Sequence, residues 1–174
     1  MSLFDNIVWH ALSGPHLAYS IGTTVVRRYA PGFSPIIGFA NPEQPDLPAL
    51  NPFCEPGEHL YCDAWSGSVS DGWRIEREAV MLKMIWAGAT PGTDEAPDAV
   101  QLCSQHASHA LDLATLTRPG PFGIRTIELG DYFGFFEGSR LLAMAGERFR
   151  AGTRAKLAVS ARIRIFRGAA SRDG

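Results

Sequence analysis

The spacing of apolar residues at the start of the chain predicts a short helix followed by a helical turn. Asp5-Asn6 can cap a helix from Ile7 to Leu12, because the apolar residues begin directly after two good capping residues. Ser13-Gly14-Pro15 should end this helix, since glycine and proline both disfavour its continuation. One or two further helical turns are expected within residues 15–21.

Short apolar blocks after this helix predict strands separated by turns. Strands are expected at residues 25–29, 34–39 and 60–65. Five prolines between positions 41 and 56 make that segment mostly loop. Residues 73–86 should form two strands or one long bent strand. Residues 1–90 are therefore expected to form a small α+β region.

The pattern changes after a linker at residues 91–98, which is part of a segment rich in glycine and proline. A short strand over residues 99–102 should lead into a helix over residues 104–116. The buried stripe of that helix consists of apolar residues three and four positions apart: Ala107, Ala110, Leu111 and Ala114. Prolines at 119 and 121 should end it, because proline lacks the amide donor.

A β-hairpin is expected next, with strands over residues 131–136 and 140–149 and a turn at Glu137-Gly138-Ser139. Strand, helix and antiparallel strands in this order predict an α+β or mixed α/β domain over residues 99–149.

Composition places the chain among ordinary globular proteins. Its 174 residues are 45% hydrophobic and 20% charged, and no apolar run is long enough to cross a bilayer. The first residues carry an acid and no base, which is the wrong charge pattern for a secretory signal. Cys54, Cys62 and Cys103 are an odd number without framework spacing. Reduced thiols and a cytoplasmic location are therefore expected, with no membrane partner.

The charge of the chain changes sharply near residue 150. From Arg150 onward there are seven basic residues and one acid, whereas the preceding residues hold nine bases and 17 acids. The net charge of −2 is thus about −8 before this point and +6 after it. A basic tail of this kind is one signature of nucleic-acid binding.

Few residues suggest chemistry on their own. The chain has no Walker-type loop, no G-x-G-x-x-G and no G-x-S-x-G. Cys103, His106 and His109 have the residue types of metal ligands, but a fourth ligand is missing, so an exposed polar helix face is expected and no metal site. His10 could act in catalysis, although a half-buried histidine held by local hydrogen bonds fits its setting better.

Acidic residues gather around the predicted hairpin: Glu128, Asp131, Glu137 and Glu147. One of them could serve as a general base if burial raised its pKa toward neutrality. The same acids would also suit any solvated strand edge. Tyr132 fits a proton donor by type and fits a packing residue of the hairpin equally well.

Two stretches of the sequence resemble bacterial GNAT-superfamily N-acetyltransferases. Residues 6–16 read N-I-V-W-H-A-L-S-G-P-H, and residues 116–130 read L-T-R-P-G-P-F-G-I-R-T-I-E-L-G. R-L-L-A-M-A-G-E-R follows at residues 140–148, so the resemblance covers the chain to about Arg150. It implies a mixed sheet with flanking helices and acetyl transfer from acetyl-CoA to the amine of a small-molecule or peptide acceptor.

The resemblance also suggests site residues near the family's substrate side. Arg118 and Arg125 become candidate substrate-binding residues. Glu128, Tyr132 and Glu147 become candidate catalytic residues, although each also fits a structural role.

The family's cofactor segment is not found where the resemblance predicts it. In the family, the strand at 140–148 leads into a segment resembling V-C-T-H-P-x-x-x-G-R-G-x-A. The backbone amides of its turn point at the pyrophosphate of coenzyme A, and the following helix N-terminus favours the negative charge. Residues 150–174 do not contain this motif, so no cofactor-binding residues are intact and the GNAT-like sheet is expected to be incomplete.

The genetic code offers an explanation for residues 150–174. When the first two bases of each codon are taken as the last two bases of a shifted codon, residues 156–172 permit E-I-x-x-V-C-T-H-P-D-x-x-G-R-G-L-A in order. We therefore expect a frameshift near Arg150, from a mutation or a sequencing error, that truncates the enzyme. Residues 150–174 would then be a disordered, out-of-frame basic tail, and acetyltransferase activity would be lost. The charge of the tail would give no reason to expect a nucleic-acid partner.

Two other functions stay open at this point. The chain could be a small-molecule or protein-binding module without catalysis, in which Trp9, Trp65, Trp73 and Trp86 line a pocket, although tryptophans more often fill a core. It could also bind nucleic acid through its tail. An incomplete sheet should leave the hairpin with an exposed apolar face and an unpaired edge.

Overall fold

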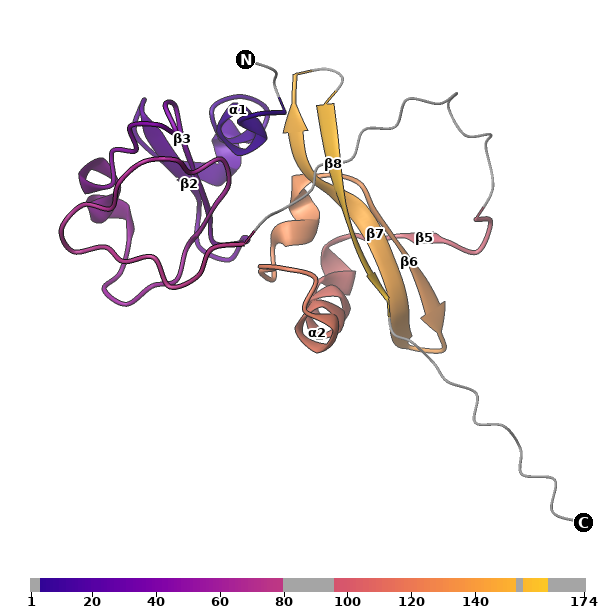
Figure 1. Cartoon of the computed structure of the whole chain (residues 1–174). Helices are drawn as coiled ribbons and strands as arrows, with labels where there is room; N and C mark the ends of the chain where they lie inside the picture. The colour runs from indigo at the N-terminus through magenta and orange to yellow at the C-terminus, as the bar shows by residue number, and fades with distance from the viewer. Residues whose placement is uncertain (1–3, 80–95, 153–154, 163–174) are drawn as a thin grey trace, which may run out of the picture.

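A computed structural model describes residues 4–79, 96–152 and 155–162. These residues form two four-stranded sheets, and helix α1 (Ile7–Leu12) packs between them (Figure 1). The predicted mixed α+β class is confirmed, and α1 begins and ends at the predicted residues. Within the described ranges, no helix has the length and apolar composition needed to span a bilayer.

The first sheet has the strand order β1-β2-β3-β4, in which β3 and β4 are parallel and the other neighbours antiparallel. Its elements are η1 (Leu17–Tyr19), β1 (Ser20–Gly22), β2 (Val26–Tyr29), β3 (Ile36–Phe39), η2 (Pro48–Phe53) and β4 (Tyr61–Cys62). β2 and β3 lie within the strands expected at 25–29 and 34–39.

The structure differs from the sequence prediction in the later part of this region. The strand expected at 60–65 is only Tyr61–Cys62, and residues 73–79 form no strand. Trp65 and Trp73 pack against the core of the first sheet instead, so their apolar surface is buried without strand pairing. Residues 80–86, which include Trp86, lie outside the described residues.

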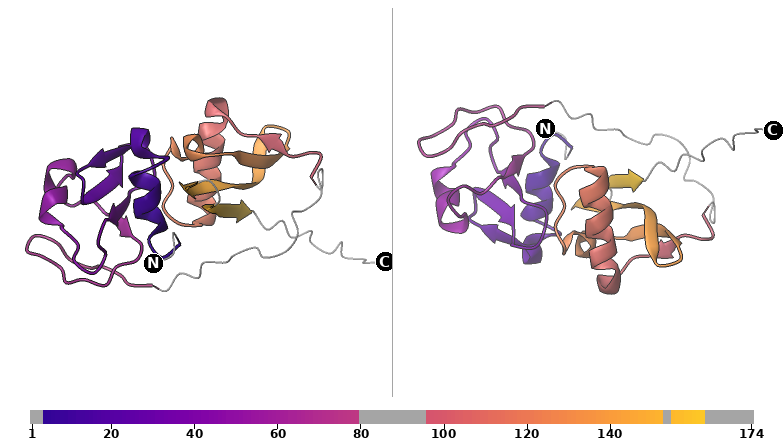
Figure 2. Two further views of the ribbon diagram at one scale, coloured as in Figure 1. Left: turned by 90° about the horizontal axis from the view of Figure 1, so that it is seen from above. Right: turned by 90° about the horizontal axis from the view of Figure 1, so that it is seen from below.

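The second sheet is antiparallel throughout, with the order β5-β6-β7-β8. Its elements are β5 (Val100–Gln101), η3 (Ser104–His106), α2 (Ala107–Thr117), η4 (Thr126–Leu129), β6 (Tyr132–Glu137), β7 (Arg140–Ala151) and β8 (Ala155–Arg162). The predicted helix and hairpin are confirmed, but Leu113 is buried in α2, whereas Ala107 and Leu111 of the expected stripe are only half-buried. α2 covers one face of this sheet and buries Ala110, Leu113 and Ala114 (Figure 2).

One core cluster joins the two halves of the chain. α1 contributes Val8 and Leu12 to it, the first sheet contributes Tyr29, and β7 contributes Phe149. A buried hydrogen bond of 3.0 Å between the hydroxyls of Ser34 and Thr126 also crosses between the halves. The linker expected at 91–98 separates the two sheets in sequence, and residues 96–98 of it are described. The core, however, runs across that division.

Strand β8 occupies part of the segment that was expected to be disordered. Over residues 155–162 the backbone pairs antiparallel with β7, with Ala145 opposite Ser160. Leu157, Val159 and Ala161 occupy every second position, which is the period that a strand requires, although Ala158 between them is apolar as well. Pairing with β7 therefore overrides the expected disorder over these residues. Residues 153–154 and 163–174 lie outside the described residues.

The hairpin exposes apolar side chains on the face that α2 does not cover. Phe133 and Phe135 of β6 are 46% and 42% exposed. The free edge expected on β7 is occupied, because β8 pairs with it along most of its length. The exposed apolar face is thus present as expected. The expected unpaired edge of the hairpin is not, because β8 pairs with β7.

Candidate functional site

An acid-rich cavity opens where the start of the chain meets the segment before the hairpin. It holds about 320 Å³ and lies between η1, η4 and the end of β7. Its lining residues are Pro15, His16, Tyr19, Glu128, Leu129, Gly130, Asp131 and Arg150. The structure thus brings the catalytic candidate Glu128 together with Asp131, one of the acids noted around the hairpin.

Glu128 and Arg125, two of the predicted site residues, form an ion pair beside this cavity. Arg125 donates from Nε and Nη2 to the Glu128 carboxylate over 3.0 and 2.8 Å. The hydrogen bonding from Arg125 lowers the pKa of Glu128. Arg125 also stacks on Phe33, with 4.4 Å from its Cζ to the ring centroid. Glu128 is therefore an anion at neutral pH, suited to holding a cation, and Arg125 is occupied by its two neighbours.

Glu147 reaches the same region from β7. Its carboxylate accepts a hydrogen bond of 2.8 Å from Arg150, and 16% of its side chain is exposed. The Glu147 amide donates to the Asp131 carbonyl over 3.0 Å, which fixes β7 against the cavity wall. Three carboxylates, with Glu128 as the third, thus gather around two arginines. The surplus of negative charge would attract a protonated amine.

His16 is the buried polar residue of this cavity, and it was not among the site residues expected from the sequence. It is 3% exposed, and its Nδ1 lies 2.7 Å from the Tyr29 hydroxyl. Burial lowers the pKa of His16, partly offset by a backbone hydrogen bond with Leu129. The imidazole is neutral at pH 7. Because it contacts the Tyr29 hydroxyl and the Leu129 backbone, we assign it a structural role in the cavity wall. Its one sequence signal was its place in the 6–16 stretch that carries the family resemblance.

Tyr132, the third catalytic candidate, lines neither this cavity nor the one described below. It is 1% exposed, and its ring packs so closely on Gly146 that an added Cβ there would lie 2.2 Å from it. It also meets Phe122 edge-on, with ring centroids 6.3 Å apart. Burial raises the pKa of the phenol. This position fits the interpretation of Tyr132 as a packing residue. The tyrosine does not join the acidic residues at their cavity.

The residues with metal-ligand types serve local roles. The Cys103 amide donates to His106 Nδ1 over 3.0 Å at the start of η3. His109 packs edge-on against Phe136, with ring centroids 5.9 Å apart. The described part of the chain contains no group of three residues placed to hold a metal ion. His10 is half-buried on α1 and lines neither cavity.

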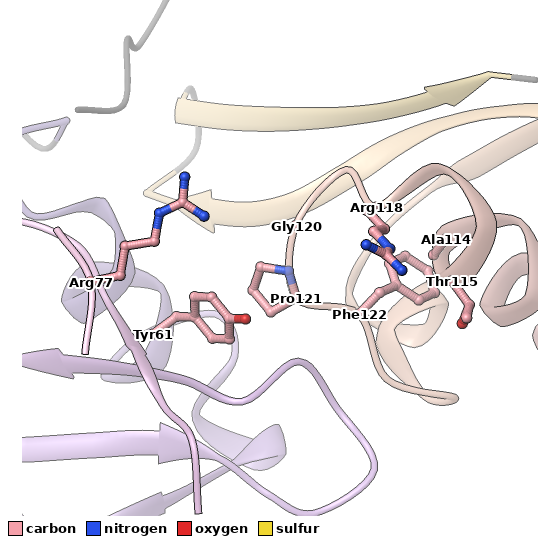
Figure 3. Close-up of a pocket in the computed structure, with 8 residues that line it drawn as sticks. All are labelled: Tyr61, Arg77, Ala114, Thr115, Arg118, Gly120, Pro121 and Phe122. Atoms are coloured by element: carbon pink, nitrogen blue, oxygen red, sulfur yellow. The ribbon is translucent and has the colours of Figure 1, made fainter. Parts of the chain in front are cut away.

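A second cavity, of about 440 Å³, lies between the N-terminal region and the loop that follows α2 (Figure 3). Its lining residues are Tyr61, Arg77, Ala114, Thr115, Arg118, Gly120, Pro121 and Phe122. The predicted substrate residues are therefore separated, because Arg118 lines this cavity and Arg125 lies beside the acid-rich one. Arg77 also lines this cavity, and it comes from a segment without a functional signal in the sequence.

Arg118 has a left-handed backbone, with φ 49° and ψ 53°, and its amide caps α2 by donating to the Ala114 carbonyl over 2.8 Å. Glycine adopts this conformation without steric cost. We expect Arg118→Gly to leave the free energy of unfolding unchanged or to raise it by up to about 1 kcal/mol, because relief of strain is partly offset by the entropy of the unfolded chain. Urea unfolding measures this. Arg118→Val should destabilise, and a loss above about 1 kcal/mol for Arg118→Gly would show that the side chain holds the loop.

Comparisons with known proteins support the fold. No family model matches the chain, and no curated protein is similar to it. Among solved structures, the crystal structure of a protein described as an acetyltransferase of the GNAT family from Novosphingobium aromaticivorans is similar, with a TM-score of 0.72 and 25% sequence identity. The match covers 97% of this chain and 74% of that one. The chain therefore has a GNAT-like fold.

Proposed function

We propose that this chain is a relative of GNAT-family N-acetyltransferases, which move an acetyl group from acetyl-CoA to an amine. The fold likeness over 97% of the chain is the observation that carries this proposal. The stretches at residues 6–16, 116–130 and 140–148 support it from the sequence, because they form α1, the end of α2 with its following loop, and β7.

The acid-rich cavity is the proposed acceptor side. Glu128 is held as a carboxylate by Arg125, and Asp131 and Glu147 add negative charge beside it. A small-molecule or peptide amine is protonated at neutral pH, so this charge would collect and orient it. Cytoplasmic location agrees with such a substrate and stays part of the proposal.

The residues after β7 do not fit a coenzyme A site. The family's turn needs closely spaced glycines whose amides face a diphosphate, and residues 163–174 read I-R-I-F-R-G-A-A-S-R-D-G. We therefore propose that residues after about Arg150 are translated out of frame and that the chain as written is inactive. Loss of a single base would produce this register, because each present codon begins with the second base of the codon it replaced.

The nucleotide sequence across codons 150–156 tests the frameshift. We expect that adding one base in this interval gives a frame that encodes V-C-T-H-P and G-R-G at the positions of residues 160–164 and 168–170. Tryptic peptides from the source organism would show which frame is translated there. A shifted frame that fails to encode these residues would overturn the proposal.

The alternative function is a binding module without catalysis. The arginine-lined cavity favours it, because that cavity is formed by residues before the proposed frameshift.

A further inference from the structure

The cavity at the end of α2 is positively charged. Arg77 approaches from the N-terminal region, and Arg118 approaches from the end of α2 on the other side (Figure 3). None of the residues that line it is acidic. Among the described residues, neither guanidinium has a hydrogen-bond or ion-pair partner.

A third arginine lies behind the cavity wall. Arg148 of β7 is 5% exposed, and its Nε and Nη2 are buried without a hydrogen-bond partner. Its Nη1 would lie 3.5 Å from a Cβ added at Gly120, and its Cζ lies 5.7 Å from the ring centroid of Phe122. Both of these neighbours line the cavity. Tyr132 is close enough to influence the pKa of Arg148, but no hydrogen bond of normal geometry joins the two side chains.

A buried guanidinium without an anion is unusual, because desolvation of the charge is costly unless a partner offsets it. Four other arginines of the described chain are paired with carboxylates: Arg28 with Glu58, Arg74 with Glu76, Arg125 with Glu128 and Arg150 with Glu147. Of the two buried arginines among the described residues, Arg28 thus has a carboxylate partner and Arg148 has none.

We propose that this cavity binds the phosphate group of a small molecule, with Arg77 and Arg118 at its rim and Arg148 beneath it. Guanidinium groups match the geometry of oxyanions, and three of them favour a dianion over a single carboxylate. The volume of about 440 Å³ suits a small molecule, and Pro121 and Phe122 give an apolar surface for the rest of it. This site goes beyond acetyl transfer and does not rest on it.

Calorimetric titration with inorganic phosphate at constant ionic strength tests the site. We expect saturable one-site binding by the full chain, weakened at least about tenfold by Arg118→Gln and by Arg77→Gln. Arg140→Gln is the matched control, because it removes the same charge from an exposed position at the β-hairpin that lines neither cavity. Absence of saturable heat, or an equal loss with Arg140→Gln, would overturn the proposal. Acetate should bind at least about tenfold more weakly than phosphate, and equal binding would overturn the choice of a phosphate.

Arg148→Met tests the buried charge separately. Methionine keeps much of the packing volume, so the variant should fold, with an unfolding temperature equal to or above that of the parent chain. Phosphate should raise the unfolding temperature of the parent chain, since a ligand that binds only the folded state stabilises it. We expect this rise to be lost in Arg148→Met. A rise of the same size in the variant would remove Arg148 from the site.

Discussion

Adding one base between codons 150 and 156 should convert a protein without measurable affinity for acetyl-CoA into one that binds it with a dissociation constant in the micromolar range. The restored turn would supply backbone amides to the diphosphate, and hydrogen bonds to a charged group contribute about 1.5–3 kcal/mol each. Two such bonds correspond to a gain in affinity of roughly 100-fold or more. Isothermal titration of both proteins measures the difference.

Pantetheine is the control ligand for this experiment, because it lacks the diphosphate that the turn is expected to hold. The restored protein should prefer coenzyme A over pantetheine, whereas the chain as written should bind neither. Micromolar, saturable binding of acetyl-CoA by the chain as written would contradict the frameshift proposal. Equal affinities of the two proteins would contradict the assignment of the turn.

Glu58→Ala should destabilise the fold by about 3 kcal/mol, because it leaves the buried Arg28 without its carboxylate. Arg28 is 4% exposed, and its guanidinium forms a two-point ion pair with Glu58. The Arg28 Nη1 also donates to the Phe53 carbonyl over 2.9 Å, so the pair joins β2 to the loop after η2. Chemical denaturation measures the loss. Glu43→Ala removes an exposed carboxylate and should change the stability by less than about 0.5 kcal/mol.

The same pair gives the stability a defined dependence on pH. Hydrogen bonding from Arg28 lowers the pKa of Glu58 below its ordinary value of 4.5. A carboxyl group with a lowered pKa in the folded state stabilises fully above its unfolded pKa, and this contribution is lost as the pH falls through the folded pKa. The parent chain should therefore lose this stability below pH 4.5, and Glu58→Ala should lack that part of the acid dependence. Parallel acid profiles of the two proteins would contradict this account.

The elements that the sequence predicted well have strong local signals. α1 is bounded by Asn6 and Ser13, and the β6–β7 hairpin turns at Gly138, between two strands rich in apolar residues. The strand expected at 60–65 was overestimated, because its apolar residues pack on a core formed by distant segments. β8 was not predicted, because residues 150–174 were expected to be an out-of-frame, disordered tail, whereas the backbone of residues 155–162 pairs with β7.

The candidate site could be predicted only partly from the sequence. Glu128 and Glu147 were proposed from the sequence, and the structure places Glu128 on the acid-rich cavity and Glu147 beside it. Arg118 and Arg125 were grouped in the sequence, yet they lie at different cavities. Arg77 had no signal and Arg148 had only its place in the 140–148 stretch, because their role depends on which segments meet at the end of α2.

The order of elements, the family resemblance and the codon pattern that points to a changed frame could all be read from the amino-acid sequence. These follow from local periodicity and residue order, which need no knowledge of distant contacts. Tertiary contacts were needed to show that α1 joins both sheets in one core, that Tyr132 is buried against Gly146, and that Arg77 and Arg118 line one cavity with the unpaired Arg148 behind its wall. Burial and charge pairing arise between segments far apart in sequence, so they become visible only when the chain is folded.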